Sequence, residues 1–376
     1  MDLNIIRKDK IGQEFEAAIS EGIFPGAVFL CALGHRIIFH EAFGMADLFE
    51  NRKMRKNTIF DLASLTKPLA TTLAIAKLIE QGKLSVDRKI SNILTEFQNT
   101  DKSNITIDML LRHTSGLPSH RNYYLEILHS NENPSQCLRN LIIKEKLESK
   151  IGEKEVYSDL GFMILAWIIE RVSGRRIDQF VSHEIYMPLG IERLLFMELS
   201  PANKKFKLYK GEFAATQHCP WRNKVLTGEV DDDNAYAVGG IDGHAGLFGD
   251  ALSVYAICSE ILKAIQNKAS TVLMPDIIKD FVQRDKAFGR VAGFDTPSKE
   301  GSSSGRFFSD FSVGHLGFTG TSFWIDPENG LIIVLLTNRV HPSRSNEGIK
   351  KFRPKIHDLV RIELMENKID KWFLGL

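Results

Sequence analysis

Ser64 and Lys67 are the residues whose types and spacing most directly suggest chemistry. They lie three positions apart in the stretch DLASLTKP at 61–68. At the start of a helix this spacing places the two side chains on one face, with Cβ atoms about 5–6 Å apart. A serine hydroxyl becomes a good nucleophile when a neighbour takes its proton, and a lysine can do so when burial or another cation lowers its pKa. The spacing suggests acyl transfer on Ser64, although Ser-x-x-Lys alone is a weak pattern.

Two later motifs could complete such a site. Tyr157 and Asp159 stand directly before the apolar segment LGFMILAWIIE, and a tyrosine at the mouth of a buried helix is well placed to face a cleft. His315 and Gly317 belong to a His-Leu-Gly motif in a predicted strand. The Ser-x-x-Lys pattern occurs only at Ser64 in the chain. Tyr157 is the only tyrosine followed two residues later by Asp or Asn.

A glycine-rich segment at 239–248 contains His244. Clustered glycines indicate tight turns or close approach of a ligand, so His244 either faces a pocket or satisfies a backbone carbonyl. The acidic run at 231–234 is interpreted as a solvated turn rather than a metal site. His218-Cys219 has no partner pair at zinc-ligand spacing. We therefore predict no metal and no cofactor.

The helix expected to position Ser64 runs over 64–81. Its apolar residues recur at helical spacing, and Gly82 supplies the stop. Pro68 is tolerated in a first turn, where its missing N–H has no partner, so it places the helix start near Ser64. The serine then lies at the positive end of the helix dipole, which favours an oxyanion there.

The remaining pattern predicts an α/β (α+β) fold, an antiparallel sheet flanked by helices, with an inserted all-helical domain. Residues 119–150 are expected to be a polar excursion with helical patches and no chemistry, and 200–230 to be irregular. The sheet domain is expected to comprise 1–62 and 240–376, the helical domain 63–239, and the site to lie at their junction. The expected helices are 8–21, 64–81, a short one in 104–111, 160–170, one within 176–197, 251–266 and 346–365. The expected strands are 27–33, 36–44, 314–320, 321–326 and 331–337.

Composition narrows the class of partner. The 376 residues are 43% hydrophobic, which suffices for a sizeable core, and 48 Lys and Arg against 47 Asp and Glu give a net charge of +1. This balance disfavours nucleic acid and anionic membranes, so the expected partner is a small molecule or short peptide. No apolar run approaches a membrane span. The polar N-terminus shows no signal peptide and the four dispersed cysteines suit a reducing compartment, so a cytoplasmic location is expected, or an exported one if the native chain begins earlier.

Taken together, the motifs resemble those of the serine β-lactamase and penicillin-binding-protein superfamily. The likeness is to the class C-like branch with D-aminopeptidases, D-alanyl carboxypeptidases and class VIII esterases. It covers nearly the whole chain. It rests on Ser64-x-x-Lys67, Tyr157-Ser158-Asp159 and His315-Leu316-Gly317 in that order, supported by the segment 106–118 and by Thr337-Asn338-Arg339.

The resemblance implies a role for each matching residue. Ser64 matches the nucleophile that forms an acyl-enzyme, and Lys67 the group that takes or relays its proton. Tyr157 matches the proton shuttle to the leaving group, with a pKa expected to be lowered by the adjacent ammonium. The backbone N–H groups of Ser64 and Phe318 match the oxyanion hole. Asp159, His315, Gly317 and His244 are then candidates for substrate binding.

Two departures from the family pattern bear on the substrate. Asp159 stands where many relatives have Asn, which adds a negative charge near Lys67. His315 and Leu316 replace the Lys-Thr pair that grips a carboxylate, so efficient β-lactamase activity is not expected. The resemblance implies hydrolysis of a D-amino-acid peptide or amide, or of a muropeptide fragment. Esterase activity, weak β-lactamase activity and a non-catalytic sensor of peptidoglycan fragments are the alternatives.

Overall fold

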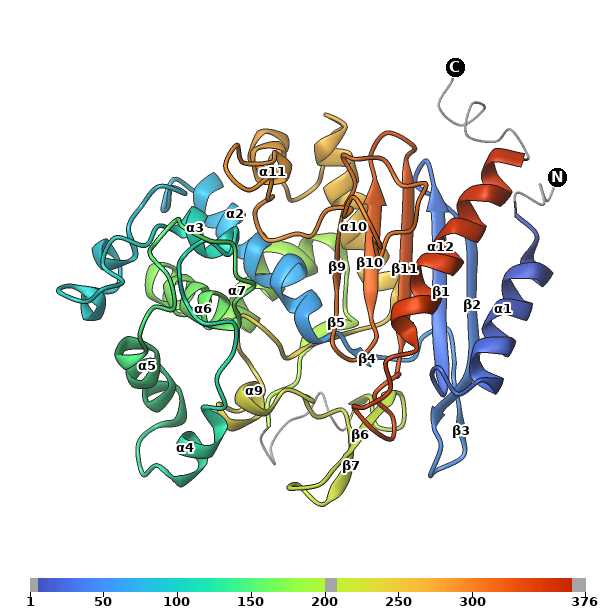
Figure 1. Ribbon diagram of the computed structural model, residues 1–376, viewed down its shortest axis with the longest axis horizontal. Helices are drawn as coiled ribbons and strands as arrows, with labels where there is room; N and C mark the ends of the chain where they lie inside the picture. The colour runs from blue at the N-terminus through green and yellow to red at the C-terminus, as the bar shows by residue number, and fades with distance from the viewer. Residues whose placement is uncertain (1–5, 200–207, 367–376) are drawn as a thin grey trace.

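The computed structural model describes residues 6–199 and 208–366, and its main feature is a six-stranded antiparallel sheet in the order β3-β2-β1-β11-β10-β9 (Figure 1). Its strands come from both ends of the chain. The predicted antiparallel sheet, the N-terminal hairpin and the three C-terminal strands are therefore confirmed. The strands are β1 Gly26–Leu33, β2 Arg36–Asp47, β3 Arg52–Lys53, β9 Val313–Leu316, β10 Ser322–Asp326 and β11 Leu331–Thr337.

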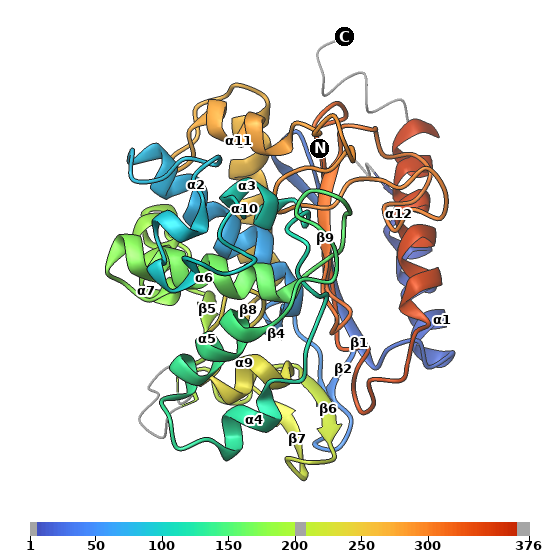
Figure 2. The ribbon, with the colours of Figure 1, turned by 60° about the vertical axis from the view of Figure 1, so that its left-hand side comes forward.

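The sheet is buried on both faces because its central strands are apolar throughout. In β1, Val28 and Leu30 face one core and Phe29 and Cys31 face the other, as the two-residue period of a strand requires. Helices α1 (Lys8–Ser20) and α12 (Ile349–Glu366) cover the second face together. Helix α10 (Ala251–Ile265) packs on the first face, against β1, β10 and β11 (Figure 2).

A helical layer lies beyond α10 on the same side of the sheet (Figures 1 and 2). Its centre is α6 (Asp159–Ser173), which is almost wholly buried and packs on α2 (Leu73–Glu80) and α3 (Ile107–Leu111). The other helices are α4 Tyr124–His129, α5 Pro134–Lys144, α7 Ile177–Val181, α9 Asp233–Ala237 and α11 Pro275–Val282, with a small sheet of β4 Phe60–Asp61, β8 Leu247–Gly249 and β5 Leu194–Phe196.

The helix expected over 64–81 is divided into three parts. A 3₁₀ turn at Ala63–Leu65 is followed by a π-helical segment at Lys67–Thr72, and only Leu73–Glu80 is α-helical. Pro68 has no N–H to donate to the carbonyl of Ser64, so the regular i to i−4 pattern cannot form there. Ser64 thus lies in a tight turn before the regular helix.

Part of the segment expected to be irregular is a hairpin. β6 (Ala215–Cys219) and β7 (Lys224–Thr227) pair antiparallel, while 200–207 lies outside the described residues. The hairpin has little apolar alternation, which is why its strands were missed. Within 6–199 and 208–366, no helix combines the length and apolar character needed to cross a membrane. The same ranges contain no group of three His, Cys, Asp or Glu side chains arranged to hold a metal ion.

Candidate active site

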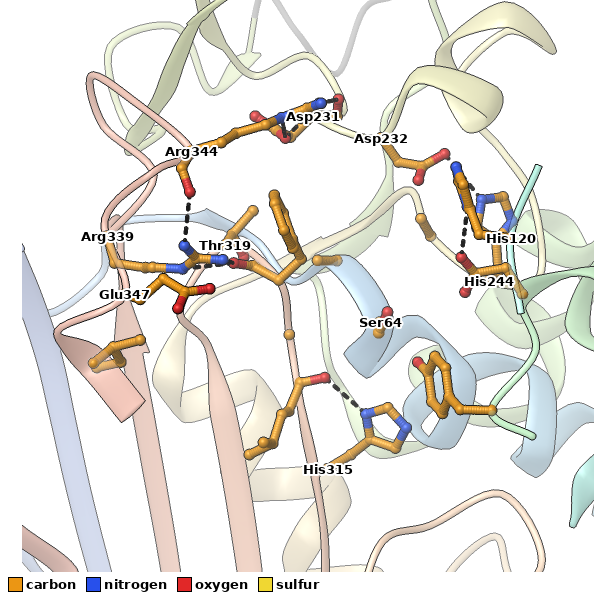
Figure 3. Close-up of a pocket in the computed structure, with 18 of the residues that line it drawn as sticks. Ser64, His120, Asp231, Asp232, His244, His315, Thr319, Arg339, Arg344 and Glu347 are labelled. Atoms are coloured by element: carbon orange, nitrogen blue, oxygen red, sulfur yellow. Dashed lines mark hydrogen bonds and ion pairs between the residues drawn. The ribbon is translucent and has the colours of Figure 1, made fainter. Parts of the chain in front are cut away.

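A cavity of about 630 Å³ brings the sequence-predicted residues together (Figure 3). It opens between the turn that carries Ser64, the start of α6 and the edge strand β9. Lys67 is the one predicted site residue that does not line the cavity, because its side chain is fully buried and reaches Ser64 from within. Lining the cavity are the predicted residues Ser64, Tyr157, Asp159, His244, His315, Gly317 and Phe318.

The turn before Ser64 is held in an unusual conformation. Ala63 has φ +48°, in the left-handed region that a residue with a Cβ rarely adopts. The buried carboxylate of Asp61 accepts the N–H of Ala63 at 2.9 Å, and the Thr319 hydroxyl donates to the Asp61 carbonyl at 2.7 Å. These bonds fix the turn from both sides. Ser64 is thereby presented at the cavity on a rigid support.

The ammonium of Lys67 makes three hydrogen bonds. Nζ donates to Ser64 Oγ at 3.1 Å, to Asp159 Oδ1 at 2.8 Å and to the carbonyl of His244 at 3.1 Å. It also lies 4.9 Å from the centre of the Tyr157 ring, within cation–π range. Since a buried ammonium needs its donors satisfied, this arrangement fixes Nζ beside the serine hydroxyl.

The charge state of Lys67 is set by its burial and by its charged neighbours. Burial alone would lower the pKa of Lys67. Asp159 and, after it, Tyr157 together raise this pKa by more than burial lowers it, so it lies above its ordinary value. The pKa of Asp159 would be raised by burial, yet the Lys67 ammonium and the hydrogen bond from His120 hold it well below its ordinary value. The negative charge that the sequence placed near Lys67 lies 2.8 Å from its Nζ and keeps the proton on the lysine at rest. The resting pair is ammonium and carboxylate.

Tyr157 is more basic than predicted. Burial and the Asp159 charge raise the pKa of Tyr157, Lys67 lowers it, and the net pKa lies above its ordinary value, so the phenol is neutral in the resting site. The rings of His113 and Tyr157 lie 4.6 Å apart. The Nδ1 of His113 accepts the N–H of Ser158, which is also the N-cap of α6. The segment around His113 therefore anchors both the tyrosine and the helix that follows it.

Strand β9 forms the opposite wall of the cavity. His315 is buried, its Nδ1 lies 2.9 Å from the Leu316 carbonyl, and burial lowers the pKa of its imidazole. Its ring centre lies 6.0 Å from that of Tyr157. The N–H of Gly317 donates to the carbonyl of Thr321 at 2.7 Å, which closes the turn that presents Phe318. His315 is thus a neutral group facing the tyrosine.

His244 lies on the wall nearest Asp159 and resolves the alternatives left open by the sequence. It lines the cavity, and its own carbonyl accepts from Lys67. Its Nε2 lies 2.9 Å from Asp232 Oδ1, and its Nδ1 lies 3.5 Å from Asp242 Oδ2. Burial lowers the pKa of His244, but Asp232 and Asp242 raise it to about 10. His244 is therefore an imidazolium at neutral pH.

The acidic run at 231–234 is not a solvated turn. Asp231 is buried and forms an ion pair with Arg344, and Asp232 pairs with His244 (Figure 3). Asp232 also caps α9. The solvated interpretation failed because the partner cations come from distant positions in the chain. The run supplies the anionic wall of the cavity.

Several cavity residues were missed by sequence reasoning. His120 and Asn122 come from the excursion expected to have no chemistry, and His120 Nδ1 lies 3.1 Å from Asp159 Oδ2. A second group consists of arginines and a lysine from the chain after β11. Among them only Arg339 belongs to a motif cited from the sequence, and its role at the cavity was not predicted. The Arg and Lys residues that line the cavity are Arg339, Arg344, Lys350 and Arg353.

Comparison with known proteins places the chain among named relatives. The family model described as Beta-lactamase matches residues 12–354. The chain is 33% identical to the N-acetylmuramyl-L-alanine amidase of Bacillus subtilis (strain 168), over 88% of this chain and 81% of that protein. It is 30% identical to a putative D-alanyl-D-alanine carboxypeptidase of Escherichia coli (strain K12), over 90% of this chain and 83% of that protein.

Solved structures share the fold at lower identity. EstCE1, a hydrolase with promiscuous acyltransferase activity, superposes with a TM-score of 0.75 at 23% identity, covering 94% of this chain and 98% of that one. The octameric penicillin-binding protein homologue from Pyrococcus abyssi has a TM-score of 0.70 at 20% identity, covering 96% and 78%. The β-lactamase and transpeptidase-like fold is therefore confirmed.

Proposed function

The chain belongs to the Beta-lactamase family of serine hydrolases, and from this premise we propose that it cleaves an amide bond in a peptidoglycan-derived fragment through an acyl-enzyme on Ser64. The observation that carries the proposal is the 3.1 Å contact between Ser64 Oγ and an ammonium fixed by Asp159. Two relatives at 30% identity or more are named as an amidase and a carboxypeptidase, and both names denote cleavage of an amide bond.

The proton path follows from the charge states of Lys67 and Tyr157. Both are protonated at rest, so the active base is the form in which this coupled pair has lost one proton. Ser64 Oγ bonds to the substrate carbonyl carbon while its proton passes to the pair. Tyr157 then gives a proton to the amine as the C–N bond breaks. Water hydrolyses the resulting ester by the reverse transfers, which regenerates Ser64.

The oxyanion is proposed to be held by the backbone N–H groups of Ser64 and Phe318. Gly317 allows the Phe318 N–H to come close to the Ser64 turn, because a Cβ at position 317 would lie 2.1 Å from Thr321 Oγ1 and 2.6 Å from the Leu62 carbonyl. The strand end can therefore approach the Ser64 turn only with glycine at this position. One donor of an oxyanion hole is worth about 10²–10³ in rate.

Replacing Gly317 tests this role. Gly317→Ala is expected to lower kcat/KM by about 10²–10³, because the added methyl pushes the Phe318 N–H away from the carbonyl oxygen. Steady-state kinetics with one acyl substrate measures the loss. Gly12→Ala is the matched control, since its Cβ would meet only Phe43 at 3.9 Å and lies in α1. Wild-type kcat/KM in folded Gly317→Ala would remove Phe318 from the oxyanion hole.

A panel of acyl donors tests the proposed function directly. The protein is incubated with N-acetylmuramyl-L-alanyl-D-isoglutamine, diacetyl-L-lysyl-D-alanyl-D-alanine, p-nitrophenyl butyrate and a penicillin, and intact mass and peptide mapping locate any adduct. We expect turnover of an amide donor with a transient ester on Ser64 that is absent from Ser64→Ala. Reaction with the butyrate alone would make the protein an esterase. No adduct or turnover, including no labelling by a fluorophosphonate, would favour a non-catalytic sensor.

A further inference from the structure

Arg353 stands out among the cavity residues because its cation is buried. It lies near the start of α12, is only 4% exposed, and still lines the cavity. Its Nε donates to Ser322 Oγ at 3.0 Å. The guanidinium carries five N–H donors, so a single hydroxyl leaves most of them without an acceptor among the described residues.

The charge of Arg353 has no counterion among the residues that the structure describes. In 6–199 and 208–366 no carboxylate forms an ion pair with its guanidinium, and the charge that acts on it is the repulsive one of Arg339. Burial, followed by Arg339, lowers the pKa of Arg353 to about 10. The neighbouring His357 offers no negative charge, since burial and Arg353 lower its pKa to about 3. Arg353 is thus a buried, uncompensated cation facing open space.

Arg339 lies on the same side of the cavity and is better satisfied. Its Nε donates to the Phe318 carbonyl at 2.9 Å, and its Nη1 donates to the carbonyl of Arg344 at 3.0 Å. Glu347 and Asp231 act on it as attractive charges, although Glu347 is itself paired with Lys350 and Asp231 with Arg344. Arg353 therefore carries a positive charge that no described carboxylate balances.

This charge lies beside the turn that presents Phe318. Ser322, the partner of Arg353, is opposite Leu316 in the β9 and β10 register, and Arg339 binds the carbonyl of Phe318 itself. An anion held between the two guanidiniums would thus lie next to the position proposed for the reacting carbonyl. A buried charge without a partner is costly to a fold, so its retention points to a ligand.

We propose that Arg353 and Arg339 form an anion-binding subsite that receives a carboxylate group of the substrate. The inference rests on the proposed function of the same cavity. A carboxylate would supply the counterion that Arg353 lacks, and it fits the planar donor edge of a guanidinium. In this chain a carboxylate would then be bound from α12 and the segment after β11, in place of the lysine that is missing from β9.

Two matched pairs of aryl esters test the subsite. In the first pair the acyl group is constant and the leaving group is 3-hydroxybenzoate or 3-hydroxybenzamide. In the second the phenol is constant and the acyl group is succinyl or succinamoyl. We expect the carboxylate member of one pair to have a kcat/KM about 10- to 100-fold above its amide, as for hydrogen bonds to a charged group. Equal rates within both pairs would overturn the proposal.

Variants identify the residue responsible. Arg353→Met should abolish the preference and Arg353→Lys should retain part of it. Lys355→Met is the matched control on α12, because Lys355 is 64% exposed in its side chain, pairs with Glu14 and does not line the cavity. It should keep the full preference. If Arg353 only supports the fold, Arg353→Met would lower Tm and leave the preference intact. We expect its Tm to be unchanged or higher, since an uncompensated buried charge is removed.

A failure of the proposed function can be told apart from a failure of the subsite. If no ester acylates Ser64, the acyl-enzyme mechanism is wrong whatever Arg353 does. Calorimetric titration of Ser64→Ala with N-acetyl-D-alanine and with its carboxamide then decides about the subsite. Tighter binding of the acid that Arg353→Met removes would support it. Equal binding of acid and amide would reject the carboxylate assignment. So would inorganic phosphate binding more tightly than the acid in the same titration.

Discussion

Lys67→Met is expected to lower kcat/KM by about 10²–10⁴, the usual worth of general acid–base help. The same change should also destabilise the fold. It removes an ammonium that is 0% exposed and leaves the Asp159 carboxylate without its cation. Breaking a buried ion pair from one side costs about 3–5 kcal/mol. Steady-state kinetics and denaturant unfolding measure the two losses on the same preparation.

A double variant separates catalysis from stability. Adding Asp159→Asn to Lys67→Met removes the orphaned charge, so we expect most of the lost unfolding free energy to return. Activity should not return, because the pair that takes the Ser64 proton has lost Lys67. Recovery of kcat/KM in the double variant would show that Lys67 acts only by neutralising Asp159. The proposed proton path would then be wrong.

The sequence predicted the parts of the site that depend on local pattern. The strands that form the C-terminal half of the sheet were predicted from their hydrophobic residues. Pro68 located the turn that carries Ser64. Tyr157 was placed correctly because the apolar helix behind it must be buried. These predictions need only the neighbouring residues, since burial and helix starts are set over a few positions.

The charge states could not be predicted in the same way. Whether the pKa of Lys67 rises or falls depends on the balance of burial against a carboxylate at 2.8 Å. That distance is set by the tertiary structure and cannot be read from the sequence. Asp231 was misjudged for the same reason, because Arg344 reaches it across 113 positions of sequence. Of the Arg and Lys residues that line the cavity, only Arg339 belongs to a motif cited from the sequence. Arg353 looks like any polar residue of an amphipathic helix until the cavity beside it is seen.

The pH dependence of kcat/KM should follow the raised pKa values of Lys67 and Tyr157. Because the base is the pair after loss of one proton, its fraction at neutral pH is small and grows with pH. We expect kcat/KM to rise about tenfold per pH unit between roughly pH 6 and 9, without an alkaline plateau. Tyr157→Phe should lower the rate by about 10²–10⁴ across this range, while the rise with pH persists because Asp159 still raises the pKa of Lys67. A plateau beginning near pH 7 would show that the base has an ordinary or lowered pKa.

Asp159→Asn should move that rise to lower pH. The substitution removes the strongest influence that raises the pKa of Lys67, while burial, which lowers it, remains. More of the pair is then deprotonated at pH 7, although part of the stability conferred by the buried ion pair is lost. His120 supplies an independent check, because Asp159 raises its pKa and the imidazole should return toward its ordinary value in the variant, as followed by NMR. If the His120 pKa falls while the pH profile of kcat/KM stays in place, Asp159 holds the histidine but does not set the basicity of the nucleophile's partner.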